Sequence, residues 1–332
     1  MTPAGTPAPV AELGERPAAP SGAGGPWGHP YAFVPEAGSE AGRARVTRPA
    51  GPGLRVAGAA LSILAALLLG FVADVGLLGH VRHVRDRQVD YADLRGELAN
   101  GVAPVGAAPM EGVKQLAPGV PFAVLEIPRL HLREVVDEGT TARTLSRGLG
   151  HRRDTPLPGQ AGVSVIMGRQ GMYGGPFRNL DGLHEGWTIK VTTGQGTHTY
   201  RVIGVRRAGD PQPQAVAQGG GRLTLITADG TPFMPWGILR VDADLISPAQ
   251  PASAPAVAAA ALPDDEKPMA VQKSAWLPLV LLGQALVAAA ALLAWAHARW
   301  GRRHAWVVGV PVLGVLGLLV ADNAALLLPN LM

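Results

Sequence analysis

Three long apolar runs limit what this chain can fold into more than any other feature. The first, Val56–Ala73, carries Ser62 as its one polar side chain, and the other two lie near the C-terminus. An α-helix of about 20 apolar residues crosses the roughly 30 Å hydrocarbon core of a bilayer. The first run follows a tail too long for an ordinary signal peptide, so an uncleaved anchor is favoured. We predict transmembrane helices over residues 53–79, 273–298 and 305–328.

The loop between the last two runs sets the predicted topology. Residues 299–304 read Arg-Trp-Gly-Arg-Arg-His, and short arginine-rich loops stay in the cytoplasm. We therefore expect a multi-pass protein of the cell membrane with a cytoplasmic N-terminus and an extracytoplasmic region between the first two helices. Asp322 lies toward the outer end of the last helix, where an interfacial or helix-pairing role is favoured over a transport pathway.

The rest of the chain divides by composition. Residues 1–52 are rich in Ala, Pro and Gly without apolar periodicity, which predicts a disordered cytoplasmic tail. Residues 80–119 combine a charged, amphipathic stalk helix with a linker, and residues 247–272 form a second, Ala/Pro-rich linker. That leaves residues 120–246 as the one water-soluble domain, and their number suits a single core.

The domain over 120–246 is punctuated by short strand-like runs with turn residues between them. In one of these runs Ile189 and Val191 alternate with polar residues. Many short strands, with only two short helical candidates at 141–147 and 176–183, favour a mainly β barrel or sandwich. The strand candidates are residues 122–127, 163–167, 188–193, 199–205, 222–227 and 238–246.

Composition excludes several classes of function. The 332 residues include no cysteine, which excludes disulfides, thiolate metal sites and thiol nucleophiles. A net charge of +4 without a basic run predicts no nucleic-acid partner. His80 and His83 share a helical face but lack a third metal ligand, and Gly219–Gly221 lacks the Lys-Ser/Thr of a phosphate loop. We therefore expect no metal site and no cofactor.

Four segments of the domain carry, in this order, a resemblance to a known family. They read Leu-Glu-Ile-Pro-Arg-Leu at 125–130, Gly-Leu-Gly-His at 148–151, Tyr-Gly-Gly-Pro-Phe at 173–177 and Leu-Thr-Leu-Ile-Thr at 223–227. Across residues 122–246 the chain resembles the sortases, and most of all the class E type of actinobacteria. The resemblance implies an eight-stranded sortase-like β-barrel with short helices in the cell-wall space. Sortases cleave a sorting signal and transfer the acyl group to a cell-wall or pilus amine.

The resemblance implies three catalytic positions, and none of them holds the family's residue. Arg169 stands in place of the histidine, Ala228 in place of the cysteine and Gly237 near the place of the arginine. Transpeptidation needs a thiolate that attacks the carbonyl, a proton donor and an oxyanion stabiliser. An alanine methyl cannot attack, and a guanidinium that stays protonated cannot shuttle a proton. We predict a sortase-like pseudoenzyme, a relative without transpeptidase activity.

The favoured hypothesis for function is binding or scaffolding by a membrane-anchored protein. The lipid bilayer is one expected partner, and the others are a sorting-signal-like peptide, an active sortase and an anionic cell-wall polymer. Arg152, Arg153 and Arg169 are candidate ligands for an anionic partner. Separate, solvated surface arginines are the simpler interpretation of these three residues.

Two other hypotheses stay open. One is an enzyme of altered mechanism, a peptidase or acyl transferase that uses His151 with Asp154 or Asp229 for acid–base chemistry. In the simpler interpretation, Asp229 is a turn residue before Gly230, and His151 matches a non-catalytic histidine of the family pattern. The other hypothesis is a membrane-embedded partner protein, in which the three helices matter most and the barrel is a sensor.

Overall fold

The computed structural model describes residues 61, 65–66, 68–101, 103, 106, 116–300 and 302–332. The tail predicted over residues 1–52 lies outside the described residues, and so does most of the linker predicted near residue 110. The domain predicted over 120–246 and both C-terminal helices are described.

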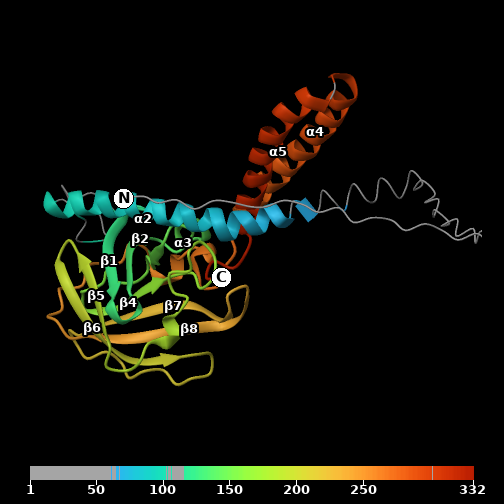
Figure 1. Cartoon of the computed structure of the whole chain (residues 1–332). Coiled ribbons are helices and arrows are strands. Elements are labelled where there is room, and N and C mark those ends of the chain that lie inside the picture. The colour runs from blue at the N-terminus through green and yellow to red at the C-terminus, as the bar shows by residue number, and fades with distance from the viewer. Residues whose placement is uncertain are drawn as a thin grey trace, which may run out of the picture. The chain divides into compact units, whose positions relative to one another are not determined.

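A closed barrel of eight strands forms the centre of the described chain (Figure 1). Around the barrel the strand order is β1, β2, β3, β4, β7, β8, β6 and β5, with β5 pairing back onto β1. The predicted mainly β fold with an eight-stranded barrel is confirmed. The strands are β1 (Pro121–Ile127), β2 (Leu132–Glu138), β3 (Leu149–His151), β4 (Gly162–Met167), β5 (Thr188–Thr193), β6 (Gly196–Arg206), β7 (Gly221–Thr231) and β8 (Met234–Leu245).

Alternation along the strands fills the barrel interior with apolar side chains. In β5, Ile189 and Val191 are buried while Thr188 and Lys190 are exposed, because successive side chains of a strand point to opposite faces. Removing these apolar groups from water is the main term that stabilises the barrel. The interior cluster includes Phe122, Leu125, Ile127, Leu149, Ile166, Leu180, Leu223, Leu225, Leu239 and Val241.

Two strands and one helix differ from the sequence prediction. Strand β2 carries four charged residues among seven, and β3 has only three residues, so neither shows a strand-like pattern. The helix predicted over 176–183 is a single 3-10 turn at Leu180–Gly182. The chain before it turns at Gly174 and Gly175, whose φ angles are +85° and +53°. Those left-handed residues do not continue into a helix.

The helix predicted over 141–147 forms as α3 (Ala142–Leu145). Thr141 caps its N-terminus, because the Thr141 Oγ1 accepts a hydrogen bond from the backbone N–H of Thr144 at 3.2 Å. This short helix is placed so that Leu145 packs outside the barrel on the residues of β4 and β7.

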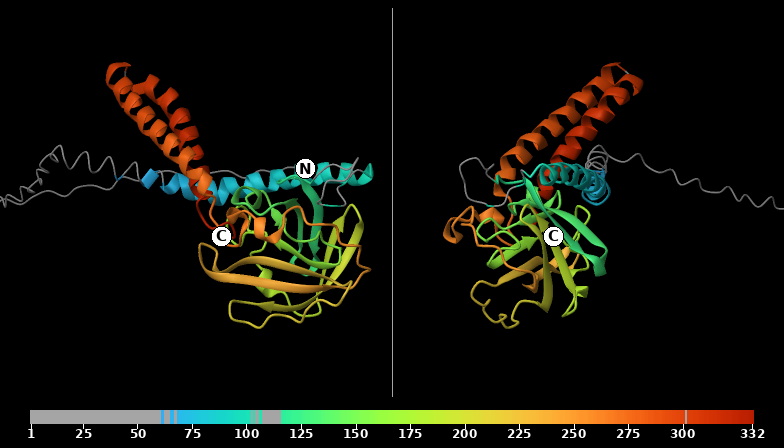
Figure 2. Two further views of the ribbon diagram at one scale, coloured as in Figure 1. Left: turned by 180° about the vertical axis from the view of Figure 1, so that it is seen from behind. Right: turned by 90° about the vertical axis from the view of Figure 1, so that its left-hand side faces the viewer.

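The predicted stalk is helix α2 (Gly79–Ala99), and it lies on the barrel. Both views in Figure 2 show it alongside β1 and β2. Leu94 is fully buried against Val124 of β1 and Val135 of β2. Arg147 of the barrel also binds Asp90 of the helix, with Nη2 and Oδ1 2.6 Å apart. The helix is therefore part of the domain's structure.

Asp137 of β2 is buried close to α2, and it should make stability depend on pH. Neither of its carboxylate oxygens has a hydrogen-bond partner among the described residues, and the Nε of Arg147 lies 3.9 Å from Oδ2. Burial raises the pKa of Asp137 from 3.8 to about 7, the Asp90 charge acts in the same sense, and Arg147 opposes both. Between those pH values the folded protein holds a proton that the unfolded chain releases.

We expect the free energy of unfolding to fall as the pH rises from about 4 to about 7. The contribution of Asp137 is fully present below the unfolded pKa and is lost through the folded pKa, with a slope of at most about 1.4 kcal/mol per pH unit. Urea unfolding at several pH values measures this slope. Asp137→Asn should flatten it, while the exposed Asp93→Asn should leave it unchanged; an identical slope in both variants would refute the assignment.

A helical hairpin follows the barrel, formed by α4 (Trp276–Trp300) and α5 (Arg302–Ala325) (Figure 2). Two segments of the described chain are long and apolar enough to cross a membrane, Lys273–Leu293 and Val307–Ala325. Three spans were predicted, so the described residues carry one fewer. Much of the other predicted span, residues 53–79, lies outside the described residues.

The bounds of the hairpin correct two predictions. The basic loop predicted over 299–304 is largely helical, because α4 continues to Trp300 and α5 begins at Arg302. The last helix was predicted to reach residue 328 but ends at Ala325, since the following residues turn toward the barrel and bond to it. Asp322 of α5 pairs with Arg82 of α2, with Oδ1 and Nη1 2.5 Å apart. Such an ion pair fits the expected helix-pairing role.

Candidate functional site

Parallel pairing of β4 with β7, and antiparallel pairing of β7 with β8, bring together the three positions that the resemblance predicts for the family's catalytic residues. Met167 lies opposite Ile226, and the Gly168 N–H donates a hydrogen bond to the Ile226 carbonyl at 3.0 Å. Two residues further along each chain, Arg169 comes level with Ala228. The next strand, β8, pairs Ile238 with Ala228 and Gly237 with Asp229. The three positions therefore lie side by side at the same height along the neighbouring strands β4, β7 and β8, with Arg169 just past the end of β4.

The outer face of β4 and β7 forms an apolar floor around Ala228. Val165 and Met167 of β4, with Ile226 and Ala228 of β7, pack in one cluster outside the barrel. Their neighbours in sequence, such as Ile166, point into the barrel interior. We call these four residues the outer floor. Leu145 of α3 packs against its edge, and Ile238 packs on it from β8.

Residues 329–332, here called the C-terminal segment, cover the outer floor. Leu331 is fully buried in the floor cluster, and its carbonyl accepts a hydrogen bond from the Gln170 N–H at 2.9 Å. The Asn330 side chain is also fully buried, and its Nδ2 donates to the carbonyls of Thr140 at 2.9 Å and Lys267 at 3.0 Å. Ala228 is left only 1% exposed.

The region predicted as a linker over 247–272 helps to hold this cover in place. Arg153 clamps Glu266, with Nε 2.9 Å from Oε1 and 3.1 Å from Oε2. The Thr140 hydroxyl donates to the Glu266 carbonyl at 2.6 Å, and the Asn330 N–H donates to the Ala270 carbonyl at 2.9 Å. Both ends of the helical hairpin are therefore bonded to the barrel beside the outer floor.

Arg169 occupies the histidine position, and its guanidinium is fully buried. The Nη2 donates to the Ala142 carbonyl at 2.9 Å, and the guanidinium carbon lies 5.0 Å from the centre of the Tyr173 ring. Among the described residues Arg169 forms no ion pair with a carboxylate. Burial lowers its pKa to about 10, which the Tyr173 charge opposes. The side chain therefore stays charged at neutral pH and cannot act as a general base.

Gly237 offers no guanidinium near Ala228, but the register places another arginine on the same face. Arg240 pairs with Ile226 of the outer floor, and directly opposed residues of neighbouring strands share a face. The sequence did not show which face of the sheet carries the Arg240 side chain, and this register places it on the outer face. Burial lowers the pKa of Arg240, and the nearby Arg206 charge adds to that effect.

His151 has a different partner from those that sequence reasoning considered. Its Nδ1 lies 2.8 Å from Oε2 of Glu138, and both side chains are completely buried. Its Nε2 lies 3.1 Å from the carbonyl of Pro156 and 3.1 Å from the hydroxyl of Thr155. Glu138 was missed because it belongs to β2, and only the parallel pairing of β2 with β3 sets it opposite His151.

Neither aspartate proposed beside His151 bonds to it. Asp154 accepts a hydrogen bond from Arg152 at 2.6 Å, and Asp229 accepts one from Arg207 at 3.3 Å. His151 pairs with Ile166, and Ile166 pairs with Leu225, four residues before Asp229 on β7. At ~3.3 Å per residue, Asp229 lies about 13 Å further along the strand.

The three arginines proposed as anion ligands are also separated by their partners. Arg152 binds Asp154, Arg153 binds Glu266, and Arg169 binds a backbone carbonyl. Each guanidinium is thus neutralised or bonded at a different place. The described residues do not bring them together in one open anion pocket.

Comparison with known proteins agrees with this architecture. Residues 125–234 match the model of the sortase domain family. This chain belongs to the sortase family. Sortase D of Bacillus subtilis is 29% identical over 85 residues, a match that covers 26% of this chain and 41% of that protein. The chain thus spans less than half of the length of that curated sortase.

Solved sortase structures cover a similar part of the chain. Sortase E from Streptomyces avermitilis is 30% identical, and the match covers 40% of this chain and 91% of that one, with a TM-score of 0.34. A sortase D-type transpeptidase from Clostridium perfringens is 20% identical, over 49% of this chain and 99% of that one, with a TM-score of 0.41. The predicted family is confirmed for residues 125–234 by the match to the sortase domain model.

Proposed function

We propose that this sortase is a catalytically inactive, membrane-anchored relative of the class E type. Its barrel faces the cell-wall space and acts by binding or scaffolding, as a partner for a sorting-signal-like peptide, an active sortase or an anionic wall polymer. One observation carries the proposal. At the nucleophile position stands Ala228, buried beneath Leu331, in a chain without cysteine.

Chemistry supports the loss of acyl transfer. A carbon-bound methyl has no lone pair with which to attack a peptide carbonyl. The residue in the histidine position, Arg169, remains protonated and donates to the carbonyl of Ala142. The outer floor, which a substrate peptide would have to reach, is already covered by the C-terminal segment. The proposed site therefore lacks a nucleophile, a residue that can shuttle a proton, and an open path for a substrate peptide.

An exposed apolar tip supports a binding role. The turn between β7 and β8 presents Phe233, Met234 and Trp236 to solvent, with exposed fractions of 59%, 74% and 73%. Clustered exposed apolar groups mark interaction surfaces, and tryptophan is among the residues that contribute most binding energy. A partner that docks here would lie at the end of the strands that carry Ala228 and Gly237.

A cleavage assay tests the proposal. Full-length protein in detergent, incubated with a fluorogenic sorting-signal peptide, is expected to release fluorescence at the rate of the enzyme-free blank. Ala228→Cys should stay at the blank as well, because neither the histidine nor the open floor is restored. Turnover by the unmodified chain that Asp229→Ala abolishes would instead establish the altered-mechanism enzyme.

A further inference from the structure

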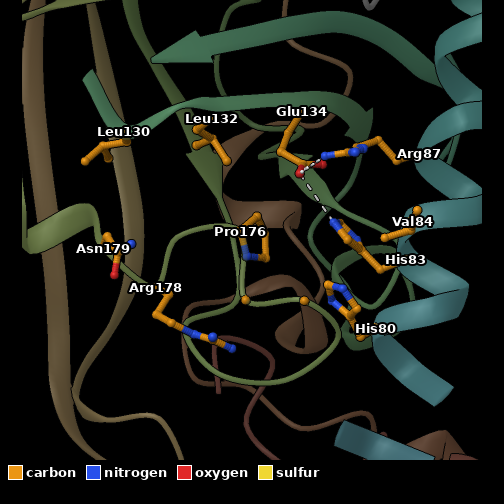
Figure 3. Close-up of a pocket in the computed structure, with 12 residues that line it drawn as sticks. His80, His83, Val84, Arg87, Leu130, Leu132, Glu134, Pro176, Arg178 and Asn179 are labelled. Carbon is orange, nitrogen blue, oxygen red and sulfur yellow. Dashed lines mark hydrogen bonds and ion pairs between the residues drawn. The ribbon is translucent and has the colours of Figure 1, made fainter. Parts of the chain in front are cut away.

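A second site shares no lining residue with the outer floor. A cavity of about 380 Å³ opens between α2, the beginning of β2 and the loop at residues 174–179 (Figure 3). Helix α2 contributes His80, His83 and Arg87, the loop contributes Arg178, and Glu134 enters from β2. None of these side chains takes part in the family's chemistry, so the cavity needs an explanation of its own.

Positive charge dominates the cavity. Arg87 and Arg178 are permanently charged, and Glu134 is the only carboxylate among the lining residues. The Glu134 Oε1 accepts from Arg87 Nη1 at 3.2 Å and lies 3.4 Å from His83 Nε2. Burial lowers the pKa of His83, but the hydrogen bond and charge of Glu134 outweigh it, so the net pKa is raised. The charges favour an anionic ligand.

Glu134 also presents an unsatisfied acceptor. Its side chain is 5% exposed, and its Oε2 is buried without a hydrogen-bond partner among the described residues. A buried carboxylate oxygen that lacks a donor costs free energy. A ligand that brings a hydroxyl or ammonium donor would remove that cost. The cavity therefore favours a ligand that carries an anionic group and, close to it, a hydrogen-bond donor.

Glycines fix the wall opposite the helix. A Cβ added at Gly174 would lie 2.7 Å from the His83 ring, and one added at Gly175 would lie 2.5 Å from the Gln170 carbonyl oxygen. Only glycine allows the loop to approach α2 this closely. Arg178 is anchored to the same loop by a hydrogen bond from Nη2 to the Gly171 carbonyl at 3.2 Å. Arg178 thus lines the cavity from the loop, and Arg87 lines it from α2.

The cavity lies at the expected level of the lipid head groups. His80 directly follows the span predicted over 53–79, and Arg82 of the same helix pairs with Asp322 near the end of the candidate span Val307–Ala325. At 1.5 Å per residue, His80 to Arg87 extend no more than about 12 Å beyond that span. The polar head-group zone is roughly 5–8 Å thick on each side of the hydrocarbon, so the His80 and His83 end of the cavity lies within this zone and Arg87 lies at most about 4–7 Å beyond its outer edge.

We propose that this cavity binds the head group of a membrane phospholipid. Arg87 and Arg178 hold the phosphodiester oxygens through charge-assisted hydrogen bonds, with His80 at the open edge. Because Oε2 of Glu134 is buried, a hydroxyl or ammonium of the head group donates to it after the carboxylate turns toward the cavity. The bound lipid would fix the barrel against the membrane surface. The inference depends on membrane anchoring and is independent of the loss of catalysis.

Binding of a short-chain phospholipid tests the proposal. Full-length protein in detergent is titrated with dihexanoyl phosphatidylglycerol, and ³¹P line broadening reports binding. The double variant Arg87→Gln/Arg178→Gln should weaken binding by about tenfold or more, the effect of losing one charge-assisted hydrogen bond. The control pair Arg85→Gln/Arg95→Gln removes the same charge from exposed positions of α2 and should change affinity by no more than about twofold. Equal weakening by both pairs would overturn the site.

Two further ligands distinguish a phospholipid head group from free phosphate as the source of the bound anion. Inorganic phosphate should bind more weakly than the lipid; equal affinity would assign the cavity to free phosphate and overturn the lipid assignment. Dihexanoyl phosphatidylmethanol has the same phosphodiester without head-group hydroxyls, so it should also bind more weakly. Equal binding of the two lipids would overturn the role of Glu134. Unchanged thermal unfolding of the double variant shows that it remains folded.

Discussion

A cysteine introduced at position 228 is expected to react with a maleimide roughly a hundredfold more slowly than one introduced at position 163. Both positions lie on the β4–β7 pair, but Ala228 is 1% exposed and Val163 is 39% exposed. Leu331 packs in the cluster that holds Ala228, and Met269 packs against it, so we expect a reagent to reach position 228 when these two segments lift from the outer floor. Because the chain contains no other cysteine, Ala228→Cys and Val163→Cys each give a single labelling rate in the detergent-solubilised protein.

A second substitution identifies the cover. In the Ala228→Cys background, Leu331→Ser should speed labelling about tenfold or more, because the hydroxymethyl group loses most of the apolar contact that seats the segment. Leu327→Ser is the matched control, since Leu327 lies in the same stretch but packs in a separate cluster with Ala142, Ala275 and Leu326. If the Ala228→Cys protein with Leu331 unchanged labels as fast as Val163→Cys, the outer floor is open to substrates and the proposed cover is wrong.

Loss of the His151 ring is expected to lower the free energy of unfolding by about 3–5 kcal/mol. The ring and Glu138 are both fully buried, and within the described part of the chain Oε1 of Glu138 already lacks a hydrogen-bond partner. His151→Ala would leave the carboxylate with no partner for Oε2 either, and it would remove the edge-on contact with Phe122 at 5.4 Å. Denaturant unfolding followed by far-UV circular dichroism measures the loss.

His184→Ala is the matched control for this prediction. His184 is exposed and stacks edge-on against Trp187 at 5.0 Å, so its loss should cost no more than about 1 kcal/mol. The result also bears on the altered-mechanism enzyme. Full stability of the His151→Ala protein would contradict the structural role of His151. A catalytic role for His151 would then be open again.

The sequence predicted the barrel well where burial follows a simple period. Strand β5 alternates in sequence as it does in space, and the apolar run before Gly168 became β4. The strands that were missed have no such period. Strand β2 is buried from Glu134 to Glu138 because α2 and neighbouring strands cover it on both sides. Burial on both faces removes the alternation that would reveal a strand.

The candidate site was predicted in part for a similar reason. The order of the motifs was enough to assign Arg169, Ala228 and Gly237 to one site, since consecutive strands of a known barrel fix their neighbours. The buried His151–Glu138 pair and the clamp between Arg153 and Glu266 join residues 13 and 113 positions apart. No local pattern reports contacts of that kind.

Composition alone determined that this chain has no cysteine, and motif order predicted Ala228 at the nucleophile position of the sortase family. That conclusion needs no coordinates, because an absent atom is absent in every fold. Only the tertiary structure decided that Leu331 packs in one cluster with that alanine and that Arg87 and Arg178 line one cavity. Both arrangements arise where segments distant in the chain pack together, and packing depends on the shapes of surfaces that form only when the barrel closes.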